Sequence, residues 1–127
     1  MNKLLCHAID MELSINGIQS ENFVVVGGMA TASIPLVKAY ALHLGKDCFY
    51  VRHDKKEYGM KKMVEGIVGP YLLMDDVTTT GYSMWKVEDT IGYEAEARFC
   101  IIDRRRKDRE SEYKKEIICL FKESDFE

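Results

Sequence analysis

The sequence has no long apolar run and no recognisable export signal. Its 127 residues contain no continuous apolar segment of the roughly 18 residues that a membrane-spanning helix needs. The first residues, MNKLLCHAIDMELSING, mix charged residues with apolar ones, whereas a signal peptide has an uninterrupted apolar centre. These absences predict a soluble, cytoplasmic protein with no membrane partner.

Cysteine is sparse, and its spacing forms no metal or redox motif. The four cysteines are Cys6, Cys48, Cys100 and Cys119; none belongs to a CxxC pair, and they lie in apolar runs such as FCII and IICLF. We expect reduced thiols in the core. A disulfide or metal framework is the weaker alternative, because a metal site needs clustered ligands and the three histidines are also scattered.

Neither sign of charge is in clear excess. Lys and Arg number 18, Asp and Glu number 21, and the formal net charge is -3. The composition gives no reason to expect nucleic acid or an anionic membrane as a partner, so any anion-binding site has to be local. The length fits one domain, residues 1–127, and 46% apolar with 31% charged residues suits a globular core.

Strand-like and helix-like segments alternate along the chain. Phe23 to Val26 is a short β-branched run that ends at two glycines, and the next helical segment has Pro35 near its start and Gly45 just after its end. The expected helices are 3–15, 33–44 and 80–91, and the expected strands are 23–26, 47–52, 71–75, 98–103 and 116–121. This order predicts an α/β fold with a mostly parallel central sheet flanked by helices. Residues 54–69 are expected to form a long loop, a common place for a lid.

The segment 71–83, YLLMDDVTTTGYS, carries the strongest functional signal. An apolar strand delivers Asp75 and Asp76, a hydroxyl-rich turn follows, and a helix begins after it. Backbone N–H groups in such a turn and at a helix start bind anions, and the hydroxyl groups can complete a phosphate cradle. The carboxylates suit sugar hydroxyls or a hydrated Mg²⁺. A simple helix cap needs only one residue of this kind.

This segment resembles the signature of type I phosphoribosyltransferases that binds 5-phosphoribosyl-1-pyrophosphate (PRPP), a strand followed by two acids and a T-T/A-G-x-S/T loop. The resemblance implies a Rossmann-like core. It also implies that Asp75 and Asp76 are catalytic and contact the ribose hydroxyls, directly or through Mg²⁺ and water. The remaining PRPP-binding residues implied here are Val77, Thr78, Thr79, Thr80, Gly81, Tyr82 and Ser83, whose loop holds the 5′-phosphate.

A glycine pair directly after the first strand is the second signal. Glycines let the backbone approach a ligand, and the following helix offers its positive end, although a tight strand-to-helix connection would use the same residues. In the family that this chain resembles, the corresponding loop receives the pyrophosphate. The resemblance therefore implies a pyrophosphate loop formed by Gly28, Met29, Ala30 and Thr31.

The segment RHDKKEYG, residues 52–59, and the downstream Glu65-Gly66 resemble a segment of orotate phosphoribosyltransferases, R-K-E-x-K-x-H/Y-G. There, a strand-end Arg and a mobile-loop Lys meet the pyrophosphate. The resemblance implies that Arg52, Lys55 and Lys56 bind PRPP and that Lys56 is catalytic. His53 stands where the family usually has Lys, and Tyr58 where many members have His. A solvated charged loop is the alternative for a stretch this rich in lysine.

The fourth signal is Arg104, which follows the strand 98–103 in a strand-end Asp-Arg pair. In the family, this Arg lies near the carboxylate or carbonyl groups of the base. The basic run that continues through 105–110 is expected to be a solvated turn. Its interleaved acids and lack of aromatic residues argue against nucleic acid binding.

Together, these resemblances imply a Mg²⁺-dependent enzyme that transfers ribose 5-phosphate from PRPP to a pyrimidine base, orotate first, and that acts as a homodimer. Orotate phosphoribosyltransferases normally carry several dozen residues before the first core helix, which form a hood over the pyrimidine. This sequence begins at about that helix. Two alternatives stay open: a phosphoribosyltransferase for a different base, and a regulatory protein that binds PRPP or a nucleotide without turnover.

Overall fold

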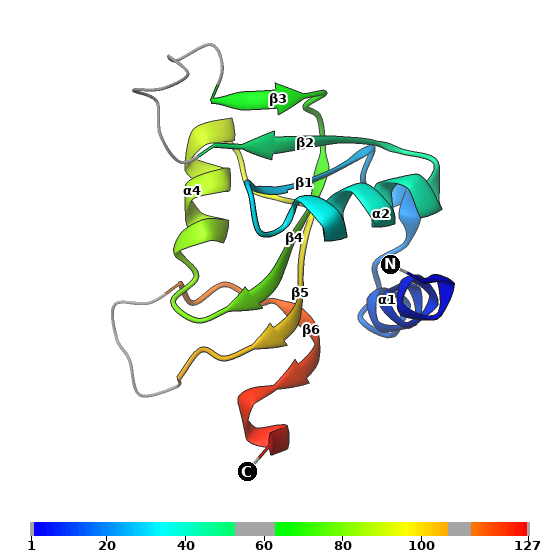
Figure 1. Cartoon of the computed structure of the whole chain (residues 1–127), viewed down its shortest axis with the longest axis vertical. Helices are drawn as coiled ribbons and strands as arrows, with labels where there is room; N and C mark the ends of the chain where they lie inside the picture. Colours follow the sequence, from blue (N-terminus) through cyan, green and yellow to red (C-terminus); the bar gives the residue numbers. More distant parts are fainter. Residues whose placement is uncertain (1, 53–62, 107–112, 127) are drawn as a thin grey trace.

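The computed structural model describes residues 2–52, 63–106 and 113–126, and its centre is a six-stranded sheet (Figure 1). The strand order is β3-β2-β1-β4-β5-β6, and only the β2–β3 pairing is antiparallel. The strands are β1 (Val25–Met29), β2 (Asp47–Val51), β3 (Val64–Gly66), β4 (Tyr71–Thr78), β5 (Ala97–Asp103) and β6 (Ile118–Lys122). This confirms the predicted fold class, a mostly parallel α/β sheet.

Helices cover both faces of this sheet. Side chains of α1 (Lys3–Ile15) and α2 (Ile34–Leu44) pack in one apolar cluster with β1, β4 and β5. Met84 and Val87 of α4 (Tyr82–Ile91) pack in a second cluster against the opposite side chains of the same strands. Short 3-10 turns lie at Ser20–Asn22 and Glu123–Phe126.

Strand β4 illustrates why the sheet is buried on both faces. Leu72 and Met74 belong to the α1–α2 cluster, whereas Tyr71 and Leu73 belong to the α4 cluster, and all four side chains are at most 1% exposed. Alternate residues of a strand point to opposite faces, so a continuous apolar run is what a central parallel strand requires.

Helix boundaries follow the local sequence signals. The side chain of Asn2 caps α1 by accepting a hydrogen bond from the N–H of Leu5 at 3.0 Å. Pro35 lies in the first turn of α2, and Gly45 ends that helix in a left-handed conformation with φ of 68°. None of the described helices combines the length and the apolar composition that crossing a bilayer requires.

The strands depart most from the prediction in three places. The first strand runs from Val25 to Met29 and includes the two glycines, all of which pair with β2. A Cβ atom at Gly27 would lie 2.1 Å from the ring of Phe49, so glycine is required where this ring packs. Strand β4 continues to Thr78, so both aspartates lie within it rather than at its end. The predicted loop 54–69 contains a short strand, β3, which is held by its pairing with β2. Three residues are too few for a periodic pattern to predict a strand.

The four cysteines lie in or beside the apolar core. All four are free thiols; Cys6 and Cys100 are buried, and Cys48 and Cys119 are half-buried. Burial raises the pKa of the Cys100 thiol to about 12, which keeps this sulfur protonated and unreactive at neutral pH.

Candidate functional site

The predicted site segments meet at the carboxyl edge of the parallel strands. The chain leaves β1 for β2 on one side through α2, and it leaves β4 for β5 on the other side through α4 (Figure 1). The neighbours β1 and β4 therefore form a topological switch point, where open α/β sheets bind ligands beyond their strand ends. The loop after β1 and the segment 75–83 both start here.

Asp75 and Asp76 place two adjacent carboxylates near this edge. Asp75 is 8% exposed and Asp76 is half-buried. Each carboxylate accepts a 2.8 Å hydrogen bond from the N–H of the next residue, Asp76 and Val77 respectively. No ion pair joins either carboxylate to a lysine or arginine of the described segments. Burial raises the pKa of Asp75 to about 7, and the Asp76 carboxyl beside it adds to the shift.

The loop after β4 turns sharply into α4 at Gly81. This residue has φ of 86°, a left-handed conformation that favours glycine, and a Cβ atom here would lie 2.1 Å from Cβ of Tyr113. The Thr80 hydroxyl accepts a hydrogen bond from the N–H of Tyr82 at 3.2 Å, and the Thr80 carbonyl accepts one from the N–H of Tyr113 at 3.2 Å. The turn is thus fixed beside the positive end of α4.

Side chains of the predicted phosphate loop differ in exposure. Thr78 and Gly81 are buried, and Ser83 is half-buried. Val77, Thr79, Thr80 and Tyr82 are exposed. The exposed threonine hydroxyls and the helix start form the part of this loop that a phosphate could reach.

The end of β1 lies against β4, and the predicted pyrophosphate loop starts there. At Gly28, a Cβ atom would lie 2.8 Å from the carbonyl oxygen of Met74, so only glycine permits this approach of the two strands. The N–H of Ala30 donates to the carbonyl of Val51 at 2.8 Å, and the peptide bond between Ala30 and Thr31 is cis. Met29 and Ala30 are buried, whereas Thr31 is exposed. Of the predicted pyrophosphate loop, only Thr31 offers an exposed side chain; Gly28 and Met29 belong to β1, and the N–H of Ala30 is already bonded to Val51.

Arg52 follows the last residue of β2, and it forms a two-bond ion pair with Glu65 on β3. Nε of Arg52 lies 3.0 Å from Oε1, and Nη2 lies 2.7 Å from Oε2. The sequence predicted Arg52 as a pyrophosphate ligand but missed this pair, since the strand that carries Glu65 was not expected. Lys55 and Lys56, together with His53 and Tyr58, lie outside the described residues.

Arg104 lies at the same edge, next to the end of β4. Its N–H donates to the carbonyl of Thr78 at 2.7 Å, and its exposed guanidinium pairs with Glu123, with Nε 2.6 Å from Oε2. The neighbouring Arg105 was expected to be solvated, and that was wrong. Its side chain is 17% exposed and bonds the Asp103 carboxylate and the carbonyls of Tyr113 and Lys115.

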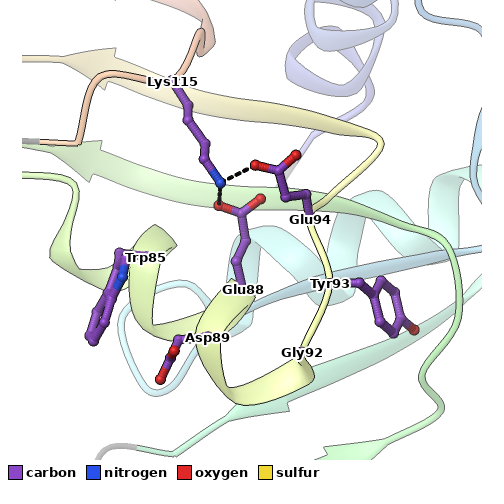
Figure 2. Close-up of a pocket in the computed structure, with 7 residues that line it drawn as sticks. All are labelled: Trp85, Glu88, Asp89, Gly92, Tyr93, Glu94 and Lys115. Atoms are coloured by element: carbon purple, nitrogen blue, oxygen red, sulfur yellow. Dashed lines mark hydrogen bonds and ion pairs between the residues drawn. The ribbon is translucent and has the colours of Figure 1, made fainter.

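A pocket of about 270 Å³ lies at the other end of α4 and is not part of this site (Figure 2). It is lined by Trp85, Glu88, Asp89, Gly92, Tyr93, Glu94 and Lys115. Lys115 bridges the carboxylates of Glu88 and Glu94, so the charges that line the pocket largely satisfy one another. The candidate site instead lies at the amino end of this helix, where Gly81 is the N-cap.

No protein-family model matches the chain, but individual proteins do. The orotate phosphoribosyltransferase of Sulfurisphaera tokodaii is 34% identical over 116 residues, which cover 86% of this chain and 60% of that protein. The structure of the Aeropyrum pernix orotate phosphoribosyltransferase superposes with a TM-score of 0.68 at 22% identity, covering 94% of this chain and 71% of that one. The Mycobacterium tuberculosis orotate phosphoribosyltransferase, solved in complex with PRPP, gives a TM-score of 0.65 at 19% identity, covering 96% and 73%.

The sheet order, the two strand-end loops and these superpositions define a phosphoribosyltransferase fold. The chain belongs to the type I phosphoribosyltransferase family, and the relatives it resembles over most of its length are orotate phosphoribosyltransferases. It spans about 60% of the length of the Sulfurisphaera tokodaii relative.

Proposed function

We propose that this chain transfers ribose 5-phosphate from PRPP to a pyrimidine base, orotate first, and releases pyrophosphate. One observation carries the proposal: Asp75 and Asp76 lie at the switch point without a described cationic partner, beside the positive end of α4. Carboxylates suit the ribose hydroxyls, and the helix start suits the 5′-phosphate. A single sugar phosphate satisfies both halves of this arrangement.

In the proposed reaction, the bond from C1′ of the ribose to the pyrophosphate oxygen breaks, and a bond from C1′ to a base nitrogen forms as that nitrogen loses its proton. Negative charge grows on the leaving pyrophosphate, so cationic side chains and backbone N–H groups near it favour the transition state. We assign this role to Arg52, Lys55, Lys56 and the loop 28–31. No side-chain nucleophile is required, and catalysis is positioning and charge stabilisation.

Magnesium fits the donor set of this site. Asp75 and Asp76 offer hard carboxylate oxygens that accept hydrogen bonds from neighbouring backbone N–H groups, and such oxygens are the ligands that a hydrated Mg²⁺ accepts. The ion would supply further stabilisation of the pyrophosphate charge. We propose that it binds near these two residues through water and PRPP.

Arg104 is the proposed base-binding residue. It is exposed at the carboxyl edge, and its guanidinium already holds a carboxylate, that of Glu123. The carboxylate of orotate could replace this partner with the same geometry. We further propose that the chain forms a homodimer, because the family resemblance that supports the reaction also implies one.

The decisive experiment mixes the purified chain with Mg²⁺, PRPP and a panel of orotate, uracil, adenine, hypoxanthine and guanine, and measures pyrophosphate release. We expect release with orotate that depends on all components. Release with another base would reassign the substrate. PRPP binding by calorimetry without turnover on any base would overturn the proposed enzymatic function and support a regulatory PRPP-binding protein.

Loss of PRPP binding in Asp76→Asn, but not in the exposed Asp89→Asn on α4, would assign binding to the proposed site.

Lys56 provides a second test. Because its charge is proposed to act on the leaving group, Lys56→Ala should reduce turnover at least a hundredfold while PRPP affinity falls much less. Lys38→Ala, which removes an exposed lysine of α2, serves as the matched control and should leave both quantities unchanged. Equal turnover in Lys56→Ala and the control would remove the catalytic assignment.

A further inference from the structure

Two histidines and an aspartate converge between α1 and α2. His7 and Asp10 lie one turn apart on α1, and His43 lies in the last turn of α2. Nε2 of His43 is 2.8 Å and Nδ1 of His7 is 3.7 Å from the same atom, Oδ2 of Asp10. The possible ligand atoms of these three side chains all lie within 4.8 Å of one another. Among the residues that the structure describes, no other group of three His, Cys, Asp or Glu side chains meets this criterion.

These distances suit a tetrahedral transition-metal ion. Zinc bonds imidazole nitrogen and carboxylate oxygen at about 2.0–2.2 Å, which places neighbouring ligand atoms about 3.4 Å apart. The two measured separations, 2.8 Å and 3.7 Å, lie on either side of that value. His43 would ligate through Nε2 once its proton resides on Nδ1, a change of tautomer alone. Two nitrogens, one oxygen and a water complete four ligands.

A buried tyrosine orients the shared carboxylate. The hydroxyl of Tyr40, a residue only 1% exposed, donates to Oδ1 of Asp10 at 2.5 Å. This bond leaves Oδ2 facing the histidines. The ring of Tyr40 also stacks on His43, with centroids 5.7 Å apart and an interplanar angle of 26°. Hydrogen-bonded second partners of this kind are what metal-binding carboxylates require.

A hydrogen-bond network that holds the two helices together is the competing explanation, and His7 distinguishes the two. The His43–Asp10 and Tyr40–Asp10 contacts satisfy such a network without a third member. The ring of His7 packs edge-on against that of His43, with centroids 5.3 Å apart, but its side chain is 63% exposed and its nitrogen lies beyond hydrogen-bond distance of Asp10. A metal ion would give His7 a bonding role.

We infer that His7, Asp10 and His43 form a zinc site that joins α1 to α2. Helix α2 starts after the carboxyl end of β1 and leads back to the start of β2, so its last turn lies away from the proposed PRPP site (Figure 1). The ion would therefore lie apart from the proposed PRPP site and fasten α1 to α2.

The test titrates the EDTA-treated, dialysed full chain with ZnCl₂ by calorimetry and measures thermal unfolding with Zn²⁺ or Mg²⁺. We expect one zinc per chain and a melting temperature raised by Zn²⁺ but not by Mg²⁺. His7→Ala should bind zinc at least tenfold more weakly and melt like the unsubstituted chain when metal is absent. Tyr40→Phe should weaken binding by about tenfold. His53→Ala, which removes the third histidine of the chain, is the matched control and should bind normally.

Two results would overturn the assignment. Absence of zinc binding, or zinc affinity unchanged in His7→Ala, would leave a hydrogen-bond network only. Binding that survives in a His7→Ala, His43→Ala double variant would place the metal at another site. Neither result bears on pyrophosphate release, so this inference and the proposed reaction fail independently.

Discussion

Burial is the main reason that the Asp75 carboxyl titrates near neutral pH. Its pKa rises from an ordinary 3.8 to about 7 because the side chain is buried next to Asp76. Between those two values the folded chain holds a proton that the unfolded chain releases, so the free energy of unfolding falls as pH rises from about 4 to about 7. Above about pH 7, the loss in the free energy of unfolding caused by the buried Asp75 charge stays constant. A site that needs an ionised Asp75 is therefore maintained at the expense of stability.

The first prediction is that Asp75→Asn stabilises the protein at pH 8 while it weakens PRPP binding. The amide keeps an acceptor for the N–H of Asp76 but carries no charge to bury. The gain is at most about 4 kcal/mol, the equivalent of the pKa shift, and it should vanish as pH falls towards 4. Urea unfolding in EDTA from pH 4 to 8 measures it. The same pH dependence in Asp75→Asn and the unsubstituted chain would show that another group is responsible.

Single residues also mark where sequence reasoning was insufficient. The run Arg104-Arg105-Arg106 has no periodicity that separates its members, yet Arg105 bonds inward and Arg104 lies exposed at the candidate site. The acceptors of Arg105 include carbonyls of the distant residues Tyr113 and Lys115, which no local pattern could indicate. The Asp75–Asp76 pair, by contrast, was recognisable because its strand, acids and glycine turn are contiguous.

At the scale of elements, the sequence predicted helices best. Helix α1 was predicted with its observed bounds, and α2 and α4 differ from prediction only at their first residues. Strand bounds were less predictable, because β1 includes Gly27 and Gly28 for packing reasons that depend on Phe49 and Met74. Strand β3 is too short for alternation to indicate it. Each miss arises from a contact between residues far apart in sequence.

The second prediction concerns the turn between β4 and α4. In Gly81→Ala, the new Cβ would meet Cβ of Tyr113, and the left-handed backbone would be strained as well. We expect a loss of about 1–3 kcal/mol in the free energy of unfolding. We also expect weaker PRPP binding, because the turn has to move.

A matched control lies at the opposite end of the same helix. Gly92 has φ of 96°, but nothing lies within 4 Å of the Cβ position. Gly92→Ala should lose about 1 kcal/mol from backbone strain alone and keep the PRPP affinity of the unsubstituted chain. If both variants bind PRPP equally, the turn at Gly81 does not shape the phosphate site.

At the scale of the whole molecule, the carboxylate of Glu88 on α4 links this helix to β5 and to the segment before β6. It is 6% exposed, and it accepts hydrogen bonds from Arg98 of β5 at 2.7 Å, from the N–H of Ala95 at 2.9 Å and from the hydroxyl of Tyr113. Lys115 approaches it from the chain that leads to β6 (Figure 2). Burial alone would raise the pKa of Glu88, but the bonds from Arg98 and Tyr113 hold it below its ordinary value.

The third prediction is that Glu88→Ala lowers the free energy of unfolding by about 3–5 kcal/mol, because it leaves the guanidinium of Arg98, 13% exposed, without its main partner. Glu94→Ala is the matched control: Glu94 pairs with the same Arg98 and Lys115 but is 67% exposed, so its loss should be at most about 1 kcal/mol. Equal losses in the two variants, measured by urea unfolding at pH 7, would contradict a buried connection. Glu88 lies towards the carboxyl end of α4, away from the phosphate loop at Gly81. The PRPP affinity of Glu88→Ala, measured under conditions where the variant is still folded, should therefore not change. This result would separate the stability of the fold from PRPP binding at the amino end of α4.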